Sequence, residues 1–275
     1  MFSQVYIPHP ALQEFVLSII AIDGILPDGI NEVITPYPPT PHQSLMFYGN
    51  HPIKMQKEGC DHFDVQPSMV VVGAMYTRVN LIVRKRLKCV RVDFHPGGLY
   101  RLLGIPMALL FDGGFDALDI LGTQMNTINS QLLDATDNDT GKDIVEKFLL
   151  KKCNHLKTLL PFDIAMRELI CRDGNVPIEK IASLACLSLR QFERKCAERI
   201  GMPPKSFARI ARFSKAYRVK EARPHLTWTA IAYEAGYFDQ MHFIRDFKEF
   251  AGVTPRIFED ALLQTPFRMQ ADLIV

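Results

Sequence analysis

The stretch IAYEAGYFDQMHFIRDFKEFAGVTP, at residues 231–255, decides how the C-terminal part of this chain folds. Apolar residues recur every three or four positions on both sides of a short break, which is the spacing of two amphipathic helices. Gly236 ends the first helix, while Asp239 is placed to cap the second and Gly252 to end it. The second helix has an apolar stripe made of Phe243, Phe247 and Phe250. Two short helices with so short a break are typical of a helix-turn-helix.

The same pattern occurs once earlier in the chain, shifted by 50 or 51 residues. The earlier helices are VPIEKIASLA at 176–185 and LSLRQFERKCAERIG at 187–201, with Ser188 as the predicted N-cap of the second. A long basic segment bounded by prolines, at 203–223, separates the two units and predicts one straight helix. An amphipathic helix over 161–174 precedes them. The sequence therefore predicts two helix-turn-helix units in tandem, joined by a helix.

This arrangement resembles the DNA-binding domain of the AraC/XylS family of bacterial transcriptional regulators, over residues 161–258. The residues that match the family pattern are Ala235, Gly236, Tyr237, Asp239, His242, Phe243, Arg245, Phe247, Lys248, Gly252, Thr254 and Pro255. Met241 and Cys196 depart from it, because a small polar residue and an aromatic residue are usual there. The resemblance implies a transcription factor that binds double-stranded promoter or operator DNA, as an activator or as a repressor.

Residues 1–160 have a different character. Between Val33 and His95, short β-branched runs alternate with Pro and Gly, as in an antiparallel sandwich or a small barrel. The segment FHPGGLYRLLGIPMALLFDG, at 94–113, resembles part of the variable companion domain found in a subset of AraC/XylS regulators. Helical spacing predicts helices over 99–104, 117–136 and 141–156.

We therefore expect an α+β fold with two domains. The first, residues 1–160, is a β-rich sensor or dimerisation domain with trailing helices. The second, residues 161–275, is an all-α DNA-binding domain.

The distribution of charge supports an anionic partner. Residues 1–160 carry 14 Lys and Arg against 16 Asp and Glu, whereas residues 161–275 carry 18 against 14. Between Arg190 and Arg223 there are eleven basic residues and three acidic ones. Such an excess favours nucleic acid as a partner, although a solvated helix surface has the same composition.

Three residues of the first recognition helix are predicted to face DNA: Arg190, Glu193 and Arg194. Arg pairs with guanine and Glu accepts a hydrogen bond from cytosine in the major groove. For Arg194, a purely structural role is an alternative, because Arg245 occupies the same position in the second unit. The predicted core stripe of this helix is Leu189, Phe192, Cys196 and Ile200.

Five residues of the second recognition helix are predicted to face DNA: Gln240, Met241, Ile244, Arg245 and Lys248. Gln can pair with adenine, Met can touch a thymine methyl group, and Lys suits a phosphate. His242, beside the core stripe, is interpreted as a packed or backbone-bonded histidine. Four basic residues of the linking helix are interpreted as phosphate neighbours or solvated charges: Lys205, Arg209, Arg212 and Lys215.

Several classes of site are not expected. The six cysteines form no CxxC pair and have no close spacing to His, so we expect no metal site and no cofactor. There is no nucleophile elbow, phosphate loop or pair of carboxylates, so the chain is not expected to be an enzyme. It also has no apolar run of about 18 residues, and we expect a cytoplasmic protein that does not enter a membrane.

The mode of control stays open between alternatives. Residues 1–160 could bind a small-molecule effector or form a homodimer, or they could dock a regulatory protein partner. An enzyme that carries this DNA-binding module is a third reading. The alkyl-transferring repair proteins that it resembles need four cysteines around zinc in the N-terminal part, whereas the first 150 residues here hold only Cys60 and Cys89. RNA polymerase is a further candidate partner.

Overall fold

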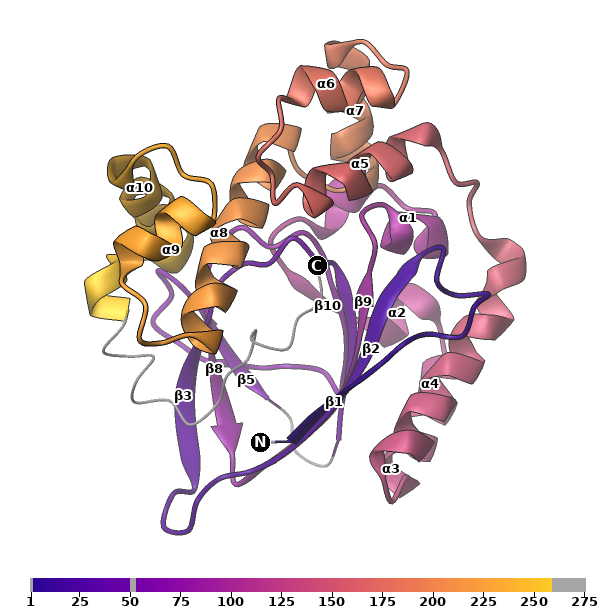
Figure 1. Ribbon diagram of the computed structural model, residues 1–275. Helices are drawn as coiled ribbons and strands as arrows, with labels where there is room; N and C mark the ends of the chain where they lie inside the picture. The colour runs from indigo at the N-terminus through magenta and orange to yellow at the C-terminus, as the bar shows by residue number, and fades with distance from the viewer. Residues whose placement is uncertain (1, 50–52, 259–275) are drawn as a thin grey trace.

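The structure, a computed structural model, describes residues 2–49 and 53–258, and ten strands in these ranges form two antiparallel sheets (Figure 1). The larger sheet has the strand order β1 (Phe2–Tyr6), β2 (Val16–Ile25), β9 (Arg86–Phe94), β4 (Ser44–Tyr48), β7 (Met69–Val72) and β10 (Gly114–Asp116). The smaller sheet has the order β3 (Glu32–Tyr37), β8 (Val79–Arg84), β5 (Lys54–Lys57) and β6 (Asp64–Val65).

The N-terminal half has three layers: the small sheet, the large sheet and a layer of helices. Leu81 of β8 and Cys89 of β9 belong to one apolar cluster, which lies between the sheets. Val92 of β9 and Leu149 belong to a second cluster, between the large sheet and the helices. The helical layer comprises α1 (Gly98–Leu103), η1 (Met107–Leu110), α2 (Ala117–Leu121), α3 (Gln124–Asp134), α4 (Asn138–Lys152) and η2 (Cys153–His155).

Strand β9 shows why both faces of the large sheet are covered. Its side chains alternate, so that Cys89 and Arg91 line the space between the sheets while Val90 and Val92 contact the helical layer. All but the first and third residues of β9 are buried. The alternation therefore brings the polar Arg91 into the interior.

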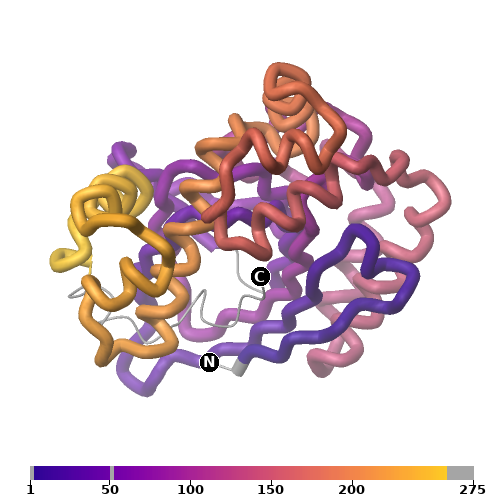
Figure 2. The backbone as a smooth tube through the Cα atoms, turned by 45° about the horizontal axis from the view of Figure 1, so that its top comes forward, coloured from indigo at the N-terminus to yellow at the C-terminus, as the bar shows by residue number. Residues whose placement is uncertain are grey.

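The C-terminal half is helical and contains the two expected helix-turn-helix units. Its helices are α5 (Pro161–Cys171), α6 (Ile178–Leu184), α7 (Leu189–Arg199), α8 (Pro204–Ala222), α9 (Trp228–Glu234) and α10 (Gln240–Ala251). Figures 1 and 2 show α6–α7 and α9–α10 as two separate units, with α8 running between them.

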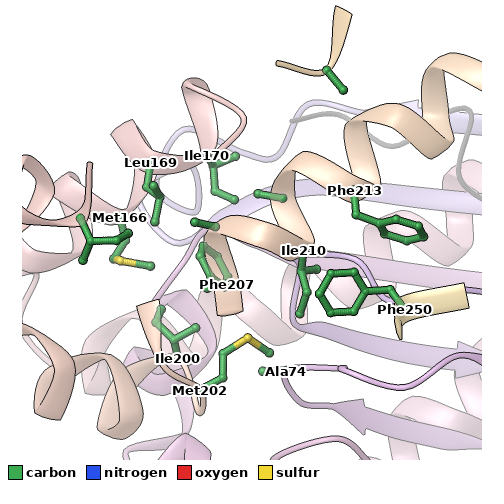
Figure 3. Close-up of a cluster of buried hydrophobic side chains, with 14 of the residues drawn as sticks. Ala74, Met166, Leu169, Ile170, Ile200, Met202, Phe207, Ile210, Phe213 and Phe250 are labelled. Carbon is green, nitrogen blue, oxygen red and sulfur yellow. The ribbon is translucent and has the colours of Figure 1, made fainter. Parts of the chain in front are cut away.

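Helix α8 supplies the core that both units share. Figure 3 shows Phe207 of α8 on the side of Met166 of α5, and Ile210 and Phe213 of the same helix beside Phe250 of α10. The Phe213 and Phe250 ring centroids are 5.4 Å apart. The turn after α5 also lies against α8, because Gly174 has φ +71° and a Cβ there would collide with the backbone carbonyl of Ala208.

The expected α+β fold is confirmed, with an antiparallel N-terminal part and a helical C-terminal part. The predicted helix over 117–136 is wrong as one element, because Gly122 has φ +85° and separates α2 from α3. The expected core position of Leu189 is also wrong. This residue opens α7 and is 36% exposed, because side chains in the first turn tilt back past the packed part of a helix.

Phe247→Ala should lower the free energy of unfolding by about 3–5 kcal/mol. Phe247 is fully buried and its ring contacts Phe213, Trp228 and Phe243. The matched control is Phe238→Ala in the same unit, which removes a side chain that is 92% exposed and should change stability by less than about 0.5 kcal/mol. Urea unfolding followed by circular dichroism measures both; similar losses for the two variants would contradict this packing.

Candidate nucleic-acid interface

The first recognition helix, α7, begins at a side-chain cap and has two distinct faces. The Ser188 hydroxyl accepts a hydrogen bond from the Gln191 backbone N–H, and the Gln191 side chain accepts one from the Ser188 backbone N–H, so the predicted N-cap is confirmed. Phe192 and Cys196 are fully buried. The outer face of α7 carries the exposed residues Arg190, Glu193 and Arg194.

The second recognition helix, α10, repeats this arrangement. Asp239 is its N-cap and accepts a hydrogen bond from the His242 backbone N–H. Among the predicted DNA-facing residues, Ile244 is half-buried against the aromatic core. The exposed ones are Gln240, Met241, Arg245 and Lys248.

His242 does not pack as the sequence suggested. Its side chain is 61% exposed, and its Nδ1 lies 2.7 Å from the Asp239 carboxylate.

The surfaces of α7 and α10 present the eight residues predicted to face DNA, of which seven are exposed. No ion pair joins Arg190, Arg194, Arg245 or Lys248 to another residue in the described ranges.

Basic residues of α8 are engaged inside the protein rather than solvated. The Arg209 guanidinium lies 2.7 Å from the Asp246 carboxylate and also binds Glu249, both on α10. Lys215 forms an ion pair of 2.7 Å with Asp173, in the turn after α5. These contacts tie α8 to α10 and to the turn after α5, so part of the basic excess is used within the protein.

Arg212 completes this set of α8 contacts. Its guanidinium donates to the Gly174 carbonyl and lies over the ring of Tyr237. The hydrogen bonds from Arg209 are the largest cause of the lowered pKa of Glu249. Lys205, in contrast, is exposed at the start of the helix.

The N-terminal half contacts the end of the first recognition helix. The Arg199 guanidinium forms a buried ion pair of 2.6 Å with Asp163 and lies 4.4 Å from the centroid of the Tyr100 ring. The Tyr100 hydroxyl donates to Glu198, and the Gln43 side-chain amide donates to the Ile200 carbonyl. The C-terminal end of α7 is therefore fixed by residues of α1 and of the segment before β4.

The N-terminal half also contacts the second recognition helix. Tyr76, which follows β7, donates a hydrogen bond to Glu249 and meets the Phe250 ring edge-on, with centroids 5.3 Å apart. One half of the chain thus touches both recognition helices near their C-terminal ends.

Sequence reasoning missed two exposed aromatic residues in the second unit. Phe238, in the turn before α10, is 92% exposed, and Tyr233 of α9 is 70% exposed. Tyr233 lies outside the apolar stripe of α9 and Phe238 lies in the turn, and these positions off the core face were the available signal. Together with Met241, also 70% exposed, they give this unit an apolar surface.

Residues 2–49 and 53–258 contain neither a cluster suited to a metal ion nor a helix that could span a membrane. In these ranges no group of three or more His, Cys, Asp and Glu side chains is arranged to hold a metal ion. None of the helices described there has both the length and the apolar character needed to span a bilayer.

Two family models match the chain. A model described as a helix-turn-helix domain matches residues 181–261, and one described as a domain of unknown function (DUF6597) matches residues 4–116. No curated protein matches it.

Solved structures similar to this chain include those of ToxT from Vibrio cholerae. ToxT from strain O395 has 12% identity and a TM-score of 0.47, over 90% of this chain and 99% of that one. Unsaturated fatty acid bound wild-type ToxT from strain SCE256 has 13% identity and a TM-score of 0.49, over 91% and 98%.

The helix-turn-helix match begins inside α6 and continues over α7, α8, α9 and α10. The matched sequence is that of a helix-turn-helix domain of the AraC type, the module of DNA-binding transcription regulators. The resemblance to the AraC/XylS family found in the sequence is thereby confirmed.

Arg199→Ala should lower the free energy of unfolding by about 3–5 kcal/mol, because it leaves the buried Asp163 carboxylate without its counter-charge. Arg190→Ala, on the exposed face of the same helix, is the matched control and should stay within about 0.5 kcal/mol of the wild type. Chemical denaturation of the two variants measures the difference. An Arg199→Ala protein as stable as Arg190→Ala would rule out a structural role for this ion pair.

Proposed function

We propose that this chain is a sequence-specific regulator of transcription that inserts α7 and α10 into two successive major grooves of one DNA duplex. The observation that carries the proposal is the pair of recognition helices, each capped at its start and each presenting exposed polar side chains opposite a buried stripe. With 19 residues, α8 is about 28 Å long, which is close to one turn of B-DNA at about 34 Å.

The proposed base contacts come from both helices. On α7, Arg190 and Arg194 are donors for guanine and Glu193 is an acceptor for cytosine. On α10, Gln240 suits adenine, and the exposed Met241 suits a thymine methyl group. The remaining proposed contacts are Ile244 at the edge of the interface, Arg245, and Lys248 at a phosphate. Phe238 is added to this set because of its exposure in the turn.

We further propose that residues 1–160 control the binding of DNA by residues 161–275. The support is the contact of Tyr100 with the end of α7 and of Tyr76 with α10, since a shift in either would change how the two units are presented. A small-molecule effector or dimerisation would produce such a shift, and so would a protein docked on the N-terminal half. Contact with RNA polymerase would complete the role of an activator.

Arg190→Ala should weaken binding to the cognate site by about 1–3 kcal/mol and relax the choice at one base pair. Lys248→Ala should instead weaken binding to all sequences alike. It should also reduce, by about one unit, the slope of the logarithm of the binding constant against the logarithm of the salt concentration. Fluorescence anisotropy with cognate and random duplexes at several salt concentrations separates the two effects. Lys151→Ala, an exposed lysine on α4, is the control and should change neither. Equal losses on cognate and random DNA would show that Arg190 only contacts the backbone.

A footprint of the full chain should contain two protected blocks with centres about 10 base pairs apart for each protomer. Two recognition helices joined by a rigid α8 require this spacing. Hydroxyl-radical footprinting on an operator selected from random DNA measures it. A single protected block at saturating protein would contradict the use of both units.

A further inference from the structure

A cavity of about 90 Å³ lies between the two sheets of the N-terminal half. Its wall is mostly apolar and includes Met46, Met55 and Met75. Methionine is unbranched and polarisable, so such a wall can repack around molecules of different shape. None of the predicted DNA-facing residues lines this cavity, and it lies apart from the DNA-facing surface.

One end of the cavity is polar, and its charges balance. Arg91 lines the cavity and forms a buried ion pair of 2.6 Å with Asp93. The Ser44 hydroxyl donates to the same carboxylate, and Arg91 donates to the Tyr37 hydroxyl. Because Arg91 already has a buried counter-charge, this arginine is not left over for a second carboxylate.

His42, at this end, supplies an unused hydrogen-bonding group. It lines the cavity and is only 3% exposed. Burial lowers the pKa of His42 to about 4, so the imidazole is neutral at neutral pH. Its Nε2 has no hydrogen-bond partner within the described residues. A buried polar atom without a partner is destabilising, and a bound polar group would remove that cost.

The volume limits the size of the occupant. A cavity of about 150 Å³ lined by apolar side chains is known to hold one benzene ring. The present cavity is smaller, so a single ring enters it with some movement of the methionines. A long alkyl chain does not fit without opening the sheets.

The polar end also lies close to the linking helix of the DNA-binding units. After burial, Asp93 and Arg91, the charge of Arg218 on α8 affects the pKa of His42. Burial is the largest cause of the raised pKa of Tyr37. The charge of Glu221, one turn further along α8, raises this pKa as well. Figure 1 shows this end of α8 next to β3 and β8. A molecule bound here would therefore lie near the helix that joins the two recognition units.

We propose that the cavity is a binding site for a small neutral molecule, mostly apolar and of about one ring, whose single hydrogen-bonding group pairs with His42. Its effect on DNA affinity rests on the function proposed above, whereas the binding itself does not.

The test uses the full chain and three probes of similar size: benzyl alcohol, which is neutral and polar at one end, toluene, which lacks the polar group, and benzoate, which is anionic. Methionine methyl groups labelled with ¹³C report binding by NMR. The methyl signals of Met46, Met55 and Met75 should shift on titration with benzyl alcohol, whereas that of Met202, buried in the helical core, should not. Benzoate should bind at least tenfold more weakly than benzyl alcohol.

Two variants make the test specific. His42→Phe should weaken benzyl alcohol at least fivefold and leave toluene unchanged, while His62→Phe, at an exposed site, should alter neither. Val72→Phe, in the cavity wall, should weaken both neutral probes. If benzoate binds as tightly as benzyl alcohol, or if the Met46, Met55 and Met75 signals of the wild type fail to shift, the proposal is overturned without reference to any variant.

Binding to DNA is measured separately on the same protein. Methyl shifts without any DNA binding would refute the proposed function and leave the cavity site intact. Normal DNA binding without methyl shifts would refute the cavity site alone.

Discussion

A buried ion pair between Arg199 and Asp163 holds the first recognition helix in its position. Asp163 also accepts a hydrogen bond from the Leu160 backbone N–H at the start of α5, and the Arg199 guanidinium lies over Tyr100 of α1. Three elements from both halves of the chain thus meet at one pair of charges. A buried pair adds little to stability compared with apolar packing, but breaking it is costly. Its main effect is on geometry, because it fixes the position of the C-terminal end of α7.

The second unit is held by comparable contacts in the C-terminal half of α10. Arg209 of α8 joins Asp246 and Glu249 of α10, and Tyr76 of the N-terminal half reaches the same Glu249. Helix α8 therefore has charged contacts to α10 and to the turn after α5, and an apolar side in the shared core. Because these basic residues are paired within the protein, the total charge excess gives less support for binding to DNA. An anionic partner is therefore better indicated by the cations exposed on α7 and α10 than by the total charge.

A second buried ion pair, Arg91 with Asp93, lies in the N-terminal half. The two pairs differ in what surrounds them. Arg199 and Asp163 are enclosed by packed side chains, whereas Arg91 lines a cavity together with His42, whose Nε2 has no partner in the described part of the chain. A complete polar network stabilises one arrangement, and an incomplete one leaves a position that another molecule can fill. The N-terminal and C-terminal halves of the chain meet at the network around Arg199 and Asp163, which is the complete one.

The sequence by itself determined the tandem units, because caps and apolar stripes are local signals. Ser188 and Asp239 act on backbone groups two or three residues away, and the period of 3.6 places Phe243 and Phe247 on one side whatever the rest of the chain does. The antiparallel β-rich character of the N-terminal half followed from the same kind of local signal. Only the tertiary structure decided which charges are free. Arg209 meets Asp246 across 37 residues, and the alternation in β9 places Arg91 in the interior only because a second sheet covers that face. Burial is a property of what packs against a surface, and that depends on contacts between segments far apart in the chain.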